Sequence, residues 1–135
     1  RLEYLNLGNS FTMYPPLSAL HQEGPSGDRM NQIRQVPDEI SRLTNLKTLI
    51  LCANDLRSLP TGIVELKHLD TLDISFNMHL TVSKEFSTLK KIHWLKYLNV
   101  VATTIDSANI NTLRKMLPKT KIDATFEDVV EEVVE

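Results

Sequence analysis

Apolar and polar residues alternate in three short stretches of the chain, and one longer pattern contains each stretch. The pattern Leu-x-x-Leu-x-Leu-x-x-Asn begins at Leu46 and recurs 23 residues later at Leu69. It recurs once more at Leu95, after a slightly longer interval, with Val100 and Thr103 in its last two defined places. Strict alternation is the period of a β-strand, and a repeat of this length is typical of a solenoid of stacked units.

The alternating stretches predict strands over residues 48–52, 71–75 and 97–101 that stack side by side in parallel. Alternation turns every second side chain into the core. The apolar residues at these inward places are Leu49, Leu51, Leu72, Ile74, Leu98 and Val100. The side chains between them are expected to face solvent and to form columns across the sheet.

An asparagine follows two of the predicted strands at the same place, at Asn54 and Asn77. An amide side chain carries both donors and an acceptor, so it can bond to the turn of its own repeat and to that of the neighbour. Thr103 occupies this place in the third repeat and can do only part of this. The pattern therefore predicts a column of side chains that holds successive turns together.

Apolar residues spaced by three predict the return path between strands. Residues 33–46 and 56–69 match place for place, and in each an apolar residue precedes a proline, at Pro37 and Pro60. Proline suits the first position of a short helix, and the spacing of three favours short helical or 3-10 turns. Over residues 33–103 the sequence resembles the intracellular class of leucine-rich repeat that carries Leu-Pro-x-x-Ile-x-x-Leu.

The resemblance implies an α/β leucine-rich repeat solenoid. Such a fold has a curved parallel sheet on its concave side and short helices and 3-10 turns on its convex side. The repeat domain is expected to span residues 1–122, in about five repeats of which one is degenerate. Solenoids of this kind present a long concave surface to another macromolecule.

The N-terminal part fits the pattern less well. A further strand is predicted around Leu5, and Leu46 lies 44 residues after Leu2, which equals two repeats of 22. The second of these would place a strand near residues 24–30, where two glycines and a proline are poor strand material. Residues 21–30 are therefore interpreted as an irregular loop or a degraded strand, expected to be mobile and sensitive to proteases.

The C-terminal part predicts a cap and a separate tail. Residues 107–117 have the spacing of a helix, and a short closing strand follows at 121–123. Residues 123–135 are expected to form an acidic amphipathic helix or tail, with Thr125 and Asp128 at capping positions. Its apolar stripe is expected to pack on the last repeat or on a neighbouring molecule.

At the other end, no residue precedes Arg1, so the first strand is expected to be an uncapped edge open to pairing. The core residues of this strand are Leu2, Leu5 and Leu7. The expectation is weak self-association through this edge, or a cap that is supplied by a longer parent protein.

Charge and apolar content limit the classes of partner. The chain has 15 Lys and Arg against 17 Asp and Glu, a net charge of −2. Six acids and no base fall in residues 123–135, which leaves +4 for residues 1–122. This is not the basic surplus of a nucleic-acid binder, and solvated convex helices account for the basic residues between 84 and 121. No apolar run reaches the length of a membrane span, so neither a nucleic-acid partner nor a membrane span is predicted.

The reactive side chains do not suggest catalysis. Cys52 is the one cysteine, so no internal disulfide can form, which favours a reducing compartment and a cytoplasmic location. No histidine in its repeat could act as a base, so Cys52 is interpreted as an incidental thiol. The four histidines lack ligand spacing, and there is no glycine-rich phosphate loop. We therefore expect no enzyme activity, no metal and no cofactor.

The outward strand residues are the candidate binding face. Their mixture of aromatic, aliphatic and small polar side chains suits a protein interface. The candidate partner-binding residues are Tyr4, Asn6, Thr48, Ile50, Thr71, Asp73, Ser75, Phe76, Tyr97, Asn99 and Val101. Trp94 either binds the partner as well or covers the edge of the next helix.

The predicted function is that of a non-catalytic scaffold or adaptor that binds another protein through its concave face. The alternative is a regulatory or substrate-recognition fragment of a larger enzyme, such as a ligase, kinase or GTPase. A domain of an immune-type receptor is a third possibility. The repeat class is often built into all of these proteins.

Overall fold

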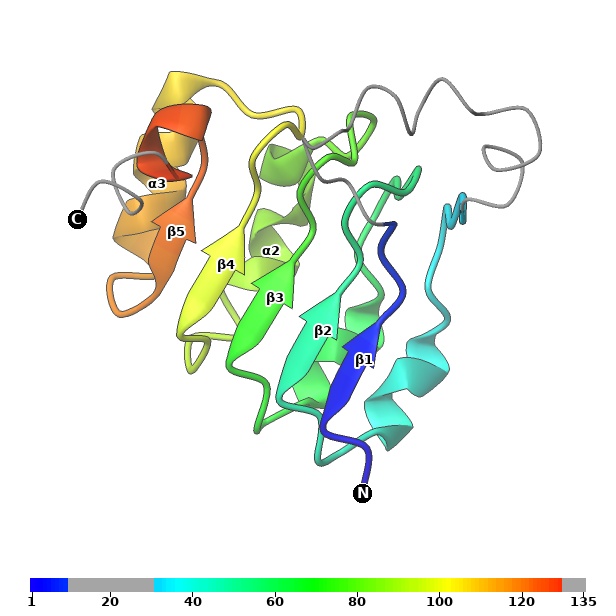
Figure 1. The fold of residues 1–135 in the computed structure, drawn as a ribbon. Helices are drawn as coiled ribbons and strands as arrows, with labels where there is room; N and C mark the ends of the chain where they lie inside the picture. Colours follow the sequence, from blue (N-terminus) through cyan, green and yellow to red (C-terminus); the bar gives the residue numbers. More distant parts are fainter. Residues whose placement is uncertain (10–30, 130–135) are drawn as a thin grey trace, which may run out of the picture.

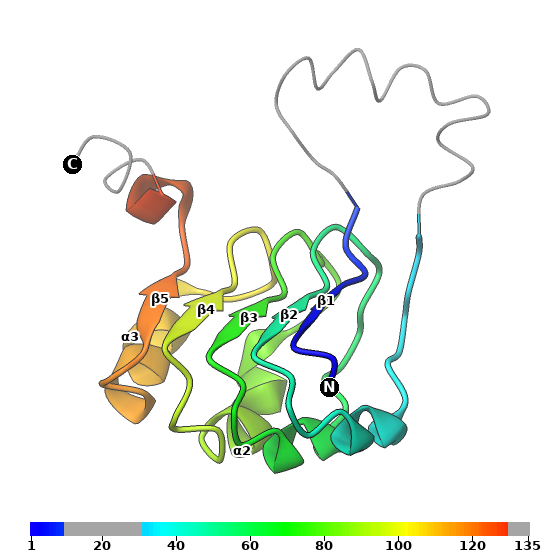
Figure 2. The same ribbon diagram turned by 60° about the horizontal axis from the view of Figure 1, so that its bottom comes forward.

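Five short strands form a single parallel sheet in chain order in a computed structural model, which describes residues 1–9 and 31–129. The strands are β1 (Tyr4–Asn6), β2 (Thr48–Ile50), β3 (Thr71–Asp73), β4 (Tyr97–Asn99) and β5 (Lys121–Asp123). The chain returns along the opposite side as short helices (Figure 1, Figure 2). These are η2 (Asp38–Arg42), η3 (Thr61–Glu65), η4 (Val82–Glu85), α2 (Phe86–Leu89) and α3 (Ser107–Met116), of which the η elements are 3-10 helices. The predicted α/β solenoid architecture is confirmed.

The register of the sheet places the core leucines in one row. Leu5, Leu49, Leu72, Leu98 and Ile122 are successive partners across the five strands. All six inward residues predicted from the alternation are fully buried. Burying a side chain of this size stabilises the fold by roughly 1.5–3 kcal/mol, so this row and its neighbours supply the main driving force for folding.

Each of the three central strands is shorter than predicted and spans only the first three positions of its alternating stretch. Three residues after each strand ends, the chain turns at Ala53, Phe76 and Ala102, which have positive φ angles of 57°, 57° and 60°. Backbone bonding between repeats nevertheless continues into the turn, where the Ala53 N–H donates to the Ser75 carbonyl at 2.9 Å. The repeats therefore stay in contact past the last residue of each strand and into the turn.

The predicted asparagine column is present. Asn77 is fully buried, and its Oδ1 accepts a bond from the Leu56 backbone N–H at 2.9 Å. Its Nδ2 donates to the carbonyls of Leu51, Ile74 and Ser75 at 3.0, 3.0 and 3.2 Å. One side chain thus joins the turn of its own repeat to that of the repeat before it.

The column continues on both sides of Asn77. Asn54 donates to the Leu7 carbonyl and accepts from the Ile33 N–H, both at 3.0 Å. Thr103 donates from its hydroxyl to the Val100 carbonyl of its own repeat at 2.7 Å. The prediction that threonine would take over only part of the role of asparagine is confirmed.

Proline and glycine shape the return path, which consists of the segments between strands. Pro37 and Pro60 are the extended residues that immediately precede η2 and η3, one position earlier than the sequence suggests. Gly62 allows the two 3-10 helices to touch, because a Cβ atom at this residue would lie 2.3 Å from the Asp38 carbonyl oxygen. Glycine at this point is therefore a packing requirement.

The first repeat contains an insertion, and the interpretation of the N-terminal part as two repeats, the second of them degenerate, is wrong. β1 pairs directly with β2, so no strand of the sheet lies between them. Asn31 precedes Leu46 by the same interval as Asn54 precedes Leu69. The stretch from Leu2 to Leu46 is thus a single repeat into which residues 10–30 are inserted.

Asn31 takes the asparagine position of this first repeat, since it makes the equivalent bond. Its Nδ2 donates to the Leu7 carbonyl at 3.1 Å, as Asn54 donates to the Leu51 carbonyl at 3.2 Å. Asn9 and Asn31, the residues on either side of the insertion, are bonded to each other: the Asn9 Oδ1 accepts from the Asn31 N–H at 2.8 Å. The predicted irregular segment, residues 21–30, lies outside the described residues.

The C-terminal end of the solenoid is capped as predicted. α3 begins after Asp106, whose side chain accepts from the Asn109 N–H at 2.8 Å. Arg114 on α3 donates to the Ile122 carbonyl of β5 at 3.2 Å and to the Asp128 carboxylate at 3.1 Å. One guanidinium therefore occupies the outer edge of β5 and ties the following segment to it.

A capping box opens this last segment. The Thr125 N–H donates to the Asp128 carboxylate at 2.9 Å, and the Asp128 N–H donates to the Thr125 hydroxyl at 3.3 Å. Burial raises the pKa of Asp128, but the backbone N–H donors and Arg114 outweigh this and lower it overall. Of the predicted apolar stripe, Phe126 and Val129 are exposed, and the remainder lies outside the described residues.

Candidate functional site

The first predicted column lies on the concave face in register. Tyr4, Thr48, Thr71 and Tyr97 are partners from strand to strand, and Lys121 continues the row. Tyr4 is 57% exposed, and the two threonines and Tyr97 are half-buried. Their predicted outward orientation is confirmed. A role for these side chains in binding a partner remains a prediction.

The second column is partly engaged in turns. The side chains of Asn6, Asp73 and Asn99 each accept a bond from the backbone N–H two residues later, at 2.9, 3.0 and 3.0 Å. These local bonds shape the turn after each strand. Ile50 takes this place in β2 and offers a half-buried apolar side chain instead. The column is therefore less available for a partner than alternation alone indicates.

Two candidate residues do not face solvent, and their assignment to the exposed face is wrong. Ser75 is 4% exposed and Val101 is 1% exposed. The extended strand ends two residues before each of them, so the alternation no longer sets the direction of their side chains. This row is tightly packed from its start, since a Cβ atom at Gly8 would lie 2.8 Å from the Cys52 Sγ.

Tyr97 has a structural bond in addition to its place on the concave face. Its hydroxyl donates to the Asp123 carboxylate at 2.6 Å, and the Lys121 ammonium lies 3.2 Å from the same carboxylate. Asp123 is buried at the end of the sheet. Tyr97 therefore holds β5 to β4.

Trp94 covers its neighbouring repeat. The indole N–H donates to the Leu66 carbonyl at 3.0 Å, and the Lys67 ammonium lies 4.6 Å from the ring centroid. The contacts thus support a structural cover, but one over the end of η3 in the preceding repeat and not over the edge of the next helix.

The pKa of the Cys52 thiol is raised, first by burial and then by the charge of Asp73. A raised pKa reduces the thiolate fraction on which nucleophilic chemistry depends. Within residues 1–9 and 31–129, no group of three or more His, Cys, Asp or Glu side chains is placed to hold a metal ion. No helix in this described part is long and apolar enough to cross a membrane.

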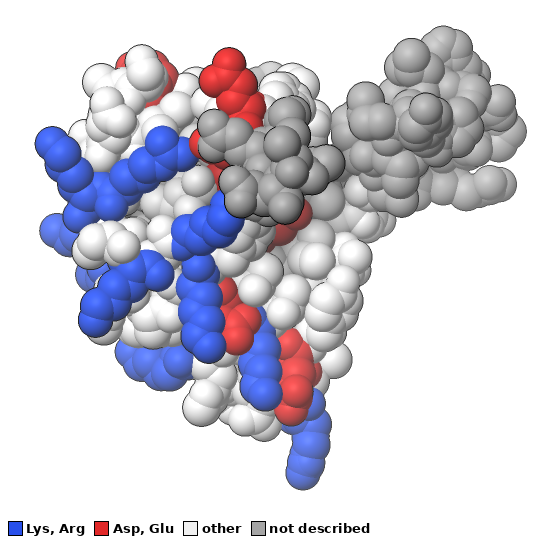
Figure 3. Space-filling view, turned by 60° about the vertical axis from the view of Figure 1, so that its left-hand side comes forward, with Lys and Arg blue, Asp and Glu red and all other residues white. Residues whose placement is uncertain are grey.

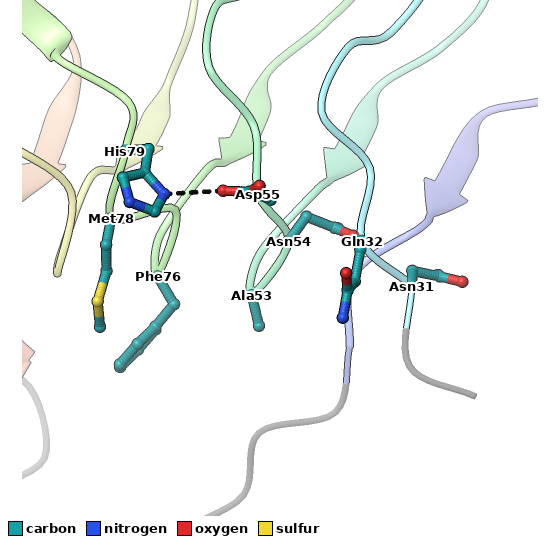
Figure 4. A pocket seen from close by; sticks show the side chains of 8 residues that line it. All are labelled: Asn31, Gln32, Ala53, Asn54, Asp55, Phe76, Met78 and His79. Atoms are coloured by element: carbon teal, nitrogen blue, oxygen red, sulfur yellow. Dashed lines mark hydrogen bonds and ion pairs between the residues drawn. The ribbon is translucent and has the colours of Figure 1, made fainter. Parts of the chain in front are cut away.

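A groove that sequence reasoning missed lies at the rim of the sheet, where the turns follow β2 and β3. Its volume is about 420 Å³. The lining residues are Asn31, Gln32, Ala53, Asn54, Asp55, Phe76, Met78 and His79. The side chains of Ala53, Phe76 and Met78 project to the same side of their successive turns (Figure 4). Met78 is 64% exposed, so the groove has an apolar edge.

Asp55 and His79 line another side of this groove, and two arginines that are not among its lining residues bond to Asp55. The Asp55 carboxylate lies 3.0 Å from the Arg57 guanidinium, 2.8 Å from His79 Nδ1 and 3.4 Å from the Arg34 guanidinium. The bonds from Arg57 and then from His79 lower the pKa of Asp55 to about 2. The carboxylate is therefore ionised at neutral pH, and it holds both arginines beside the groove.

Basic side chains gather at the end of the molecule formed by α3 and β5, with few acidic ones among them (Figure 3). The exposed cations here are Lys96, Arg114, Lys115, Lys119 and Lys121. β1 is the outer strand at the opposite end of the sheet, where Leu2 is exposed. Self-association through that strand stays a prediction.

Comparison with known proteins finds the same repeats elsewhere. The chain is 32% identical, over 137 aligned positions, to an adenylate cyclase of Schizosaccharomyces pombe, in a match that covers 93% of this chain and 8% of that protein. It is 38% identical over 84 residues to leucine-rich repeat-containing protein 66 of Mus musculus, covering 61% of this chain and 9% of that protein. The chain thus spans less than a tenth of the length of either relative.

A solved leucine-rich repeat protein of Leptospira interrogans has the same fold. It superposes with a TM-score of 0.62 at 34% sequence identity, and the match covers 69% of this chain and 23% of that one. No family model matches the chain. The repeated motif, the parallel sheet and these likenesses identify a solenoid of short strand–turn units. The chain belongs to the leucine-rich repeat proteins.

Proposed function

We propose that this domain recognises another protein through its concave sheet and the adjoining rim groove, as a scaffold or adaptor. The observation that carries the proposal is the column of Tyr4, Thr48, Thr71 and Tyr97, which lies on the face of the sheet opposite the helices. The backbone beneath this column is fixed by the leucine row and the asparagine column. A rigid surface loses little conformational freedom when it binds, which favours affinity.

The proposed role is non-catalytic. Two groups near the concave rim have shifted pKa values, and neither shift favours catalysis. The pKa of Cys52 is raised, which disfavours the nucleophilic thiolate. The pKa of Asp55 is lowered by its arginine and histidine partners, which makes the carboxylate a weaker base. A lone cysteine fits a reducing, cytoplasmic setting. A net charge of −2 argues for a protein partner rather than a nucleic acid.

A second candidate is recognition in the service of a larger enzyme. The match to an adenylate cyclase covers 93% of this chain but 8% of that protein, so a domain like this one exists within an enzyme chain. In that setting the same concave face would bind a regulator or a substrate of the enzyme. The two candidates share the binding surface and differ in what the surface is attached to.

The surface is tested by site-specific photocrosslinking in cell extract. A photoreactive amino acid replaces Thr71 on the concave face or, as the control, Ser87, which is exposed on α2. A discrete protein adduct is expected from position 71 and not from position 87. The adduct, once identified, is titrated with the chain and with the double variant Thr48→Arg, Thr71→Arg. Equal crosslinking from both positions, or unchanged affinity of the double variant, would contradict the proposal.

A further inference from the structure

Phe76 occupies a backbone position that is unfavourable for a bulky side chain. Its φ angle of 57° lies in the left-handed region, which is disfavoured for residues other than glycine and most of all for bulky ones. The turn itself does not require an aromatic ring, because alanine stands at the same place in two other repeats, at Ala53 and Ala102. A strained bulky residue at a surface groove points to a function for its side chain.

The ring of Phe76 belongs to an apolar strip. On one side lies Met78, which is exposed on the groove edge. Phe126 also lies against this ring, with its ring centroid 5.9 Å from that of Phe76, and it is 61% exposed. Exposed apolar residues that are grouped in this way mark interaction sites more often than isolated ones do.

The charged cluster around Asp55, at the side of the groove, is net positive. Two guanidiniums, of Arg34 and Arg57, and one carboxylate, of Asp55, sum to +1, and His79 adds charge when it is protonated. Both arginine side chains are largely exposed, so they keep donors for a partner. Planar guanidiniums pair well with carboxylates. The cluster therefore complements an acidic partner that reaches past the groove to the two arginines.

The chain itself places an aromatic side chain against Phe76. Phe126 contacts that ring and is followed directly by Glu127 and Asp128. This rim thus accepts an aromatic side chain from a segment with acidic residues next to it in sequence, while the Asp128 carboxylate itself bonds to Arg114. The lining of the groove beyond Phe76, toward Met78 and Ala53, is where a second such segment would lie.

We propose that this rim groove binds an acidic peptide segment of a partner protein that carries one aromatic anchor. The anchor packs on Phe76 and Met78, and the flanking carboxylates pair with Arg34 and Arg57. The inference rests on the proposed function and adds to it the chemistry of the partner. A nucleic acid would satisfy the arginines, but an apolar strip beside them favours the peptide.

The test uses the full chain labelled with 15N and a synthetic peptide, Ser-Glu-Asp-Phe-Glu-Asp-Ser. Amide shifts on titration are expected at Ala53, Phe76, Met78 and His79. Two control peptides replace the phenylalanine by alanine, or all acids by their amides. Each control peptide should bind at least about tenfold more weakly, the effect of losing one interface hot spot.

Matched variants assign the binding to the groove. Phe76→Ala keeps a residue that this turn accepts elsewhere, and it should weaken binding at least about tenfold. Arg57→Gln should weaken it as well, whereas Arg42→Gln, at an exposed residue of η2, should leave it unchanged. Equal binding by Phe76→Ala, or equal binding of the amide peptide, would overturn the inference.

Two other outcomes would also overturn it. One is the absence of any shift in the groove, and the other is preferential binding of a single-stranded oligonucleotide at the same amides. The crosslinking experiment at Thr71 separates this inference from the proposed function. If crosslinking at Thr71 succeeds while the peptide fails, the partner chemistry is wrong and the concave surface stands. If both fail, the proposed function is wrong too.

Discussion

The substitution Asn77→Ala tests whether the asparagine column holds the solenoid together. Asn77 is fully buried and makes four hydrogen bonds to backbone groups of two repeats. Alanine fills the position without any of these bonds. The perturbation is therefore confined to polar contacts and to the small space that the amide leaves.

The magnitude follows from what each backbone group retains. The Leu51 carbonyl keeps a bond from Asn54 at 3.2 Å, and the Ser75 carbonyl keeps the Ala53 N–H at 2.9 Å. The Leu56 N–H and the Ile74 carbonyl lose the bonds that Asn77 gives them. A buried polar group left without a partner costs about 1–3 kcal/mol. Two such groups, with some relief from water in the space left by the amide, give about 2–4 kcal/mol.

The assay is urea unfolding followed by circular dichroism, with Asn111→Ala on the exposed face of α3 as the matched control. Asn77→Ala should lose about 2–4 kcal/mol, a large part of the roughly 5–15 kcal/mol typical of a domain. Asn111→Ala should change little, because alanine suits an exposed helix position. A loss for Asn77→Ala no larger than that of the control would refute the reasoning.

A second substitution at the same position separates donors from acceptor. Asn77→Asp retains an oxygen for the Leu56 N–H but has no N–H to give to three carbonyl oxygens, and it buries a charge beside them. At neutral pH it should be less stable than Asn77→Ala. If Asn77→Asp is as stable as wild type, the three donated bonds contribute nothing.

Three further predictions follow from local contacts. Tyr97→Phe removes a 2.6 Å bond to the buried Asp123 carboxylate and should cost about 1.5–3 kcal/mol in chemical unfolding; unchanged stability would argue against a structural role. Asp55, with its pKa lowered to about 2 chiefly by Arg57, stabilises the fold above its ordinary pKa of 3.8, and this contribution is lost as pH falls through 2. The difference in melting temperature between wild type and Asp55→Asn should therefore shrink from about pH 5 to about pH 2, and a constant difference would exclude the contacts of Asp55 as its cause. Deletion of residues 10–30 should leave a cooperatively folding domain, since a shorter connection recovers closure entropy of about 0.6 kcal/mol per halving of length; non-cooperative melting would show that the insertion is wrongly placed.

Much of the fold was predictable because stacked repeats make the same physical demand several times. Leu49, Leu72 and Leu98 stand at one place, and a single rule of alternation puts all three in the core. The asparagine after the strand was predictable for a related reason. A buried turn leaves backbone N–H and carbonyl groups that need hydrogen-bond partners. An amide is among the few side chains that can bond to both kinds of group.

The N-terminal repeat was misread because two interpretations fit the same length of chain. The interval from Leu2 to Leu46 suits two short repeats as well as one ordinary repeat with residues 10–30 inserted. Composition cannot choose between them, since a degraded strand and an insertion both lack apolar alternation. The pairing of Leu5 with Leu49 decides the matter, and so does the bond from Asn31 to Leu7.

The concave face was predictable in direction but not in availability. Alternation places Asp73 and Asn99 outward, yet each side chain is bonded to the turn two residues on. A short polar side chain at the end of a strand often bonds to its own backbone, so its outward place is weak evidence for binding. The prediction that Ser75 and Val101 are exposed fails for a different reason. Both residues are buried, and they follow the point at which the strand has ended.

The rim groove was missed although its main signal is present in the sequence. Repeats allow each residue to be compared with its structural equivalents in the same chain, and positions 53, 76 and 102 hold alanine, phenylalanine and alanine. A residue required by the fold should recur at its equivalents, as leucine and asparagine do here. A bulky residue that breaks such a series, at a place where the backbone disfavours it, is better explained by contact with something outside the repeat. In this chain one such contact is already made by Phe126, and Phe76 also lines the groove in which a partner's aromatic side chain would make another.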